Sequence, residues 1–71
     1  MKKNAQDTLT YLIDLLTLYL GELEQVTDCA DQQFVYGEKT AYVECLEVLA
    51  QWENAEQNGL DFIVEERYPL T

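Results

Sequence analysis

The sequence predicts an all-α fold: an antiparallel two-helix hairpin with a short C-terminal helix or arm, which dimerises into a four-helix core. Two stretches, at about 6–27 and 31–57, repeat apolar residues at the three- and four-residue spacing of a helix. The polar residues between them predict a short turn that reverses the chain. Because 71 residues form one domain with a small core, we expect a second copy to contribute to that core.

The first helix is expected over about 6–27. Asn4 or Asp7 can cap its start, because a short polar side chain accepts a hydrogen bond from a free amide of the first turn. Apolar residues then recur in an unbroken heptad pattern, which predicts a row that faces the second helix. This row comprises Leu9, Leu12, Leu16, Tyr19, Leu23 and Val26.

The apolar surface of this first helix is wide. Between residues 9 and 20 it is interrupted only by Thr10, Asp14 and Thr17. One neighbouring helix cannot cover such a surface, so we expect part of it to contact a second copy or another protein. The residues predicted to form this oligomer interface are Leu12, Leu15, Leu16, Leu18, Tyr19 and Leu20.

The second helix is expected over about 31–57, with Asp28 or Asp31 capping its start. Gly59 predicts its end, because glycine adopts the left-handed conformation that terminates helices, and Leu60 can fold back onto the last turn. The apolar residues of this helix again form one broad face. They are Phe34, Val35, Ala41, Tyr42, Cys45, Leu46, Val48, Leu49, Trp52 and Ala55.

Folding the two helices about residue 29 also predicts a register. It places Gly21 opposite Gly37 and Leu16 opposite Tyr42. Two facing glycines would let the helix backbones approach closely, which is one interpretation of their presence inside helices. The other is that either glycine marks a kink or an earlier helix end.

Residues 61–68 are expected to form either a short helix capped by Asp61 or an extended arm, and the short helix is favoured. Pro69 ends the segment in both cases. Its apolar side chains can close over the hairpin or reach across to a second copy, and closure over the hairpin is favoured. These side chains are Phe62, Ile63, Tyr68 and Leu70.

The charge balance constrains the partners. Fourteen Asp and Glu residues oppose four Lys and Arg residues, which gives a formal net charge of −10. Such a surface repels nucleic acid and anionic membranes and attracts basic protein surfaces. We therefore expect a protein partner with a basic surface, and no direct contact with nucleic acid or membrane.

No catalytic motif is present, and the protein is expected not to be an enzyme. The chain has no His, and Cys29 and Cys45 lack the spacing of a metal or redox site. No cofactor or metal ion is expected. The apolar run at 9–20 is broken by Asp14 and is shorter than the roughly 20 residues of a membrane span. A soluble, cytoplasmic protein is the expectation that follows.

Acidic residues along the second helix are the candidate partner-binding site. Carboxylates three or four positions apart on a helix lie about 5–6 Å from one another, near the charge spacing of a DNA backbone. An acidic face of this kind could occupy the basic groove of a nuclease, recombinase or repressor. Alternatively, the acidic face only keeps the hairpin soluble. The residues expected to bind the partner are Glu44, Glu47, Glu53 and Glu56.

The segments 36–47, 58–61 and 67–70, about half of the chain, resemble short uncharacterised acidic proteins of Gram-positive prophages and conjugative elements. The resemblance implies a small accessory protein of a phage or mobile element that binds and modulates another protein, such as a nuclease or a recombinase. It carries no catalytic or binding residues over to this chain. The alternative function is a structural or assembly module that uses the apolar face of the first helix in a homo- or heteromeric bundle.

Overall fold

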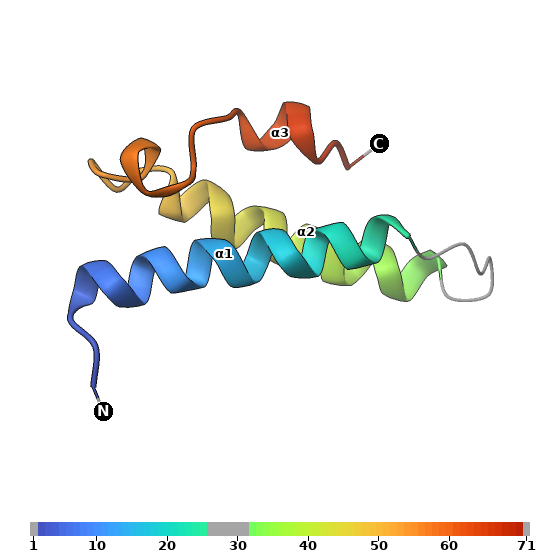
Figure 1. The fold of residues 1–71 in the computed structure, drawn as a ribbon. Helices are drawn as coiled ribbons and strands as arrows, with labels where there is room; N and C mark the ends of the chain where they lie inside the picture. The colour runs from blue at the N-terminus through green and yellow to red at the C-terminus, as the bar shows by residue number, and fades with distance from the viewer. Residues whose placement is uncertain (1, 26–31, 71) are drawn as a thin grey trace.

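A computed structural model of the chain describes residues 2–25 and 32–70. Its elements are α1 (Ala5–Glu24), α2 (Gln32–Leu49), the 3₁₀ helix η2 (Glu56–Asn58) and α3 (Val64–Arg67). The helices α1 and α2 run side by side in opposite directions, and the remaining chain returns across them (Figure 1). The all-α fold class and the helical hairpin are therefore confirmed, whereas dimerisation into a four-helix core stays a prediction.

The start of α1 has a local cause. The Asn4 side chain accepts a hydrogen bond of 2.7 Å from the backbone N–H of Asp7, so Asn4 is the N-cap. The helix continues to Glu24. The expected turn with its caps Asp28 and Asp31 falls outside the described residues, as does Cys29.

The second helix ends at Leu49, so the expected boundary near residue 57 is wrong. After Leu49 the backbone forms tighter turns, with hydrogen bonds between residues three positions apart instead of four. The backbone N–H of Trp52 bonds to the carbonyl of Leu49 rather than to that of Val48. On a continuous helix Ala55 would lie on the opposite side from Leu46, because nine residues are two and a half turns. The tighter turns instead bring Ala55 and Leu60 into the core.

Gly59 reverses the chain after η2. Its φ of 110° is left-handed, and the backbone N–H of Leu60 bonds to the carbonyl of Ala55 at 3.0 Å. This six-to-one bond is typical of a glycine C-cap. The predicted left-handed conformation of Gly59 and the folding back of Leu60 onto the preceding turn are confirmed. The helix that ends at Gly59 is η2, however, and not α2.

The other two glycines do not serve a close approach of the helices. A Cβ atom at Gly21 or at Gly37 would meet no neighbouring atom of residues 2–25 and 32–70 within 4 Å. Both glycines lie within helices and are exposed. The interpretation as facing glycines is therefore wrong, because the space at each position is open.

Replacement of the three glycines by alanine is expected to change stability in opposite directions, with Gly21 and Gly37 on one side and Gly59 on the other. Gly21→Ala and Gly37→Ala should each raise the free energy of unfolding by about 0.5–1 kcal/mol, because alanine restricts the unfolded chain and fits the helix. Gly59→Ala should lower it by about 1–2 kcal/mol, because its φ is unfavourable for a residue with a Cβ. Urea denaturation followed by circular dichroism measures all three. Equal effects at the three positions would contradict the described backbone.

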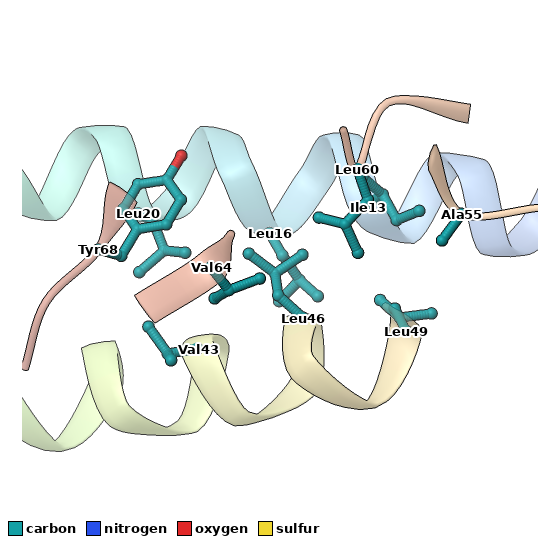
Figure 2. Packing of buried hydrophobic residues seen from close by; sticks show 10 residues of the cluster. All are labelled: Ile13, Leu16, Leu20, Val43, Leu46, Leu49, Ala55, Leu60, Val64 and Tyr68. Carbon is teal, nitrogen blue, oxygen red and sulfur yellow. The ribbon is translucent and has the colours of Figure 1, made fainter. Parts of the chain in front are cut away.

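The core combines side chains from both long helices and from the segment after Gly59 (Figure 2). We call residues 60–70 the C-terminal segment. It contributes three of the ten buried residues found within 2–25 and 32–70, so it belongs to the core. The ten are Ile13, Leu16, Leu20, Val43, Leu46, Leu49, Ala55, Leu60, Val64 and Tyr68.

The C-terminal segment contains the expected short helix, α3, which packs against α2. Asp61 does not cap it, because the N-cap position is Ile63 and no side chain bonds there. The end of the segment is fixed to α2 by a 2.8 Å hydrogen bond from Lys39 Nζ to the carbonyl oxygen of Pro69. The expected closure over the hairpin is confirmed for Phe62, Tyr68 and Leu70 and is wrong for Ile63, which is 62% exposed.

The buried row of α1 differs from the predicted heptad. Ile13 and Leu20 are almost fully buried, whereas Leu12 and Tyr19 are 37% and 38% exposed. Ile13 and Leu20 are buried because the C-terminal segment packs on their flank of α1 and covers them. Leu12 and Tyr19 of the predicted row are therefore not buried in the core, although the Tyr19 ring contacts Tyr42 of α2.

Candidate protein-binding surfaces

The four glutamates expected to form one acidic helix face do not do so. Glu44 and Glu47 lie three positions apart in α2, with Glu44 exposed and Glu47 half-buried. Glu53 lies in the turns after α2, and Glu56 begins η2. Because α2 ends at Leu49, the row of carboxylates is divided into two pairs.

The first pair is extended by the C-terminal segment. Glu47 and Glu65 line the same hollow, of about 290 Å³, beside α2 and α3. Val43 and Tyr68, which belong to the core, form part of its wall. The fold thus adds the carboxylate of Glu65 to the acidic surface of α2.

The second pair borders a different hollow, which we call the acidic hollow. It measures about 540 Å³, and its apolar wall includes the half-buried rings of Trp52 and Phe62. Ile63, which is 62% exposed, lies beside them. The carboxylates at this hollow come from Glu53, Glu56 and Asp61.

The acidic hollow suits a cationic side chain with an apolar stem. Lys and Arg bury their methylene groups against apolar walls while the charged end stays near carboxylates and water. Aromatic faces also attract cations. Phe62 already receives one such contact from its own chain, since the Arg67 guanidinium lies 4.7 Å from the ring centre.

Sequence reasoning found only Glu53 and Glu56 of this hollow. The sequence pattern assigns Asp61, Phe62 and Ile63 to the C-terminal helix or arm, and it assigns Trp52 to a helix face. They meet only because α2 ends at Leu49 and Gly59 turns the chain back. No short sequence motif indicates this arrangement.

Three of the four basic residues are engaged with the chain itself. The Lys3 ammonium lies 4.5 Å from the ring centre of Tyr11, Lys39 bonds to Pro69, and Arg67 stacks on Phe62. Each of these three cations therefore has a contact within its own chain.

No protein-family model matches the chain, and no curated protein and no solved structure matches it either. Within residues 2–25 and 32–70, no helix has both the length and the apolar character needed to cross a membrane. In the same described part of the chain, no three His, Cys, Asp or Glu side chains are grouped so that they could hold a metal ion.

A second surface lies on the side of α1 and α2 that faces away from the C-terminal segment. That segment lies beside Thr17 and Gly21 of α1 and beside Val43 of α2. The helical spacing puts other residues on the opposite flank of each helix. We call this surface the open face, and it comprises Leu12, Leu15, Tyr19, Ala41, Tyr42 and Cys45.

On the open face, the ring of Tyr19 from α1 packs against the ring of Tyr42 from α2. Their centres are 5.6 Å apart in a tilted arrangement. Burial raises the pKa of the Tyr42 phenol, and the nearby carboxylate of Glu38 raises it further, with a smaller contribution from Glu22. One end of the open face therefore carries negative charge.

The six residues predicted for an oligomer interface are divided between the core and this surface. Leu16 and Leu20 are buried within the single chain, so the prediction is wrong for these two. The C-terminal segment and α2 cover them. The other four are not buried, and Leu18 lies beside Arg67 and Tyr68 of the C-terminal segment. These four are Leu12, Leu18 and Tyr19, which are exposed, and Leu15, which is half-buried.

Proposed function

We propose that this chain is a non-enzymatic binding protein whose acidic hollow takes a basic segment of another protein and thereby modulates that protein. The observation that supports the proposal is the arrangement of Glu53, Glu56 and Asp61 around the Trp52 and Phe62 rings. A Lys or Arg side chain inserted there would meet both an apolar wall and carboxylates.

Glu44 and Glu47 have a supporting role in this proposal. They extend the negative surface along α2 and attract a basic partner over a Debye length of about 8 Å at physiological salt. Attraction of this kind accelerates association more than it strengthens the final complex. In this proposal the four glutamates act in two ways. Glu53 and Glu56 contact the bound partner directly, whereas Glu44 and Glu47 attract it from a distance.

The proposed target is a protein that itself binds DNA. Nucleases, recombinases and repressors carry basic grooves, which match the exposed acids of this chain. The resemblance to acidic proteins of prophages and conjugative elements points to the same class of target. Occupation of the groove would exclude nucleic acid from it.

Charge reversal tests the proposal. Glu53→Lys with Glu56→Lys should weaken binding of a synthetic Arg- and Leu-rich peptide by about tenfold or more, because contact charges are lost. Glu44→Lys with Glu47→Lys should weaken it by only a few fold. The fluorescence of Trp52, the single Trp of the chain, reports occupation of the hollow during a titration with the peptide.

The matched control is Asp7→Lys with Asp14→Lys, which changes net charge equally on the exposed side of α1. It should leave the peptide affinity within about twofold once salt screens the long-range attraction. Equal losses for all three pairs would contradict a specific hollow. A pull-down from the host lysate, compared between the chain and its Glu53/Glu56 variant, then identifies the target by mass spectrometry.

A second candidate function is assembly through apolar surface. The open face favours it, since the side chains of Leu12 and Tyr19 there are 37% and 38% exposed. Salt separates the two functions. Binding through the acidic hollow should weaken as ionic strength rises, whereas association through the open face should change little.

A further inference from the structure

We infer that the acidic hollow selects arginine over lysine, and that Trp52 is the ring that makes the selection. A guanidinium can stack on this ring while its N–H groups reach the carboxylates that line the same hollow. This selectivity rests on the proposed function, since it specifies which basic side chain the hollow takes.

The lining of the acidic hollow combines apolar surface, aromatic rings and carboxylates. Ala55 and Leu60, which are 3% and 5% exposed, supply buried apolar surface. The rings of Trp52 and Phe62 are half-buried, so each keeps part of its surface accessible. Of the described residues that line the hollow, three are acids, all of them exposed, and none is basic. A cation that enters the hollow therefore meets only negative charge there.

An arginine side chain can use the rings and the carboxylates at the same time. Its guanidinium is planar, so its face stacks on an aromatic ring while its N–H groups, which lie in the plane, donate to carboxylates at its edge. A lysine ammonium is compact and strongly hydrated, and it has no flat face to stack. Contact with a ring removes part of that hydration. Two side chains of equal charge therefore bind this lining unequally.

A contact within the chain indicates which ring is free for a partner. The Arg67 guanidinium lies 4.7 Å from the ring centre of Phe62. Arg67 lines a different hollow, together with Asp14, and thus holds Phe62 from outside the acidic hollow. A second guanidinium on Phe62 would be repelled by the charge of Arg67.

Trp52 carries no such contact. Within residues 2–25 and 32–70, no Lys or Arg side chain stacks on its ring. Among aromatic side chains, Trp also attracts cations most strongly. The selection of arginine is therefore assigned to Trp52 and not to Phe62.

Two peptides of equal charge test the selectivity on the unmodified chain. One is the Arg- and Leu-rich peptide, and the other carries Lys in place of each Arg. The Arg peptide should bind about fivefold to tenfold more tightly, because only the guanidinium both stacks on Trp52 and donates to the carboxylates. Isothermal titration calorimetry measures both affinities. Long-range attraction is the same for the two peptides, since it depends on their charge.

The outcomes separate the selectivity from the proposed function. Affinities within about twofold of each other would overturn the selectivity and leave the proposed function standing, because charge alone would then account for binding. Tighter binding of the Lys peptide would overturn the selectivity in the same way. Binding of neither peptide would overturn both.

Matched variants test the assignment to Trp52. Trp52→Leu and Phe62→Leu each remove one ring from the same wall, and circular dichroism checks that both variants fold. Trp52→Leu should reduce the ratio of the two peptide affinities to within about twofold, because the stacking surface is lost. Phe62→Leu should keep the preference for arginine. A preference that survives in Trp52→Leu and disappears in Phe62→Leu would overturn the assignment.

Discussion

Tyr68→Ala is expected to lower the free energy of unfolding by about 3–5 kcal/mol, the usual loss for a large aromatic side chain in a core. Tyr68 is 5% exposed and lies in the core beside Leu20 (Figure 2). A domain of this length has a total stability of only about 4–10 kcal/mol. The variant should therefore be largely unfolded in mild urea, as measured by circular dichroism.

Tyr36→Ala is the matched control, because Tyr36 is 53% exposed on α2. It should change the stability by less than about 0.5 kcal/mol. If the two tyrosine variants had similar stability, the C-terminal segment would not be part of the core.

Leu20→Ala should cost about 2–5 kcal/mol, since Leu20 is fully buried and its removal leaves a cavity. Leu18→Ala, two positions earlier on the same helix, should cost less than about 0.5 kcal/mol, because Leu18 is 58% exposed. Thermal denaturation of both variants at low protein concentration separates folding from association. A larger loss at Leu18 than at Leu20 would contradict the described orientation of α1.

The parts of the fold that were predictable have local causes. The cap at Asn4 depends on its own side chain and one nearby amide. The left-handed turn at Gly59 depends on the absence of a Cβ atom. Two long apolar periodic stretches suffice to predict the hairpin. Each of these signals lies within a few residues of its effect.

The parts that were not predictable depend on contacts between distant segments. The end of α2 at Leu49 follows from burial of Ala55 and Leu60, which a continuous helix would prevent. The choice of Ile13 over Leu12 as a core residue follows from the position of the C-terminal segment on one flank of α1. The spacing of apolar residues alone does not predict which of the two is buried, because Leu12 and Ile13 both fit an apolar stripe along the helix.

The candidate site was predictable by residue type and not by position. The acidic composition indicated a basic partner, and Glu53 and Glu56 do border a hollow. Asp61 and Phe62 join them only after the turn at Gly59. The division of the expected acidic row into two pairs follows from the same early end of α2.

The central claim is that the C-terminal segment covers one side of the helix pair and leaves the other side open. Nuclear Overhauser effects in an isotope-labelled sample test it most directly. We expect cross-peaks from the Tyr68 ring to the methyl groups of Leu20, which lies behind it in Figure 2, and of Val43, which lines the same hollow. We expect none from Tyr68 to Leu12 or Leu15. Cross-peaks from Tyr68 to Leu12 or Leu15, with none to Leu20 or Val43, would contradict the account.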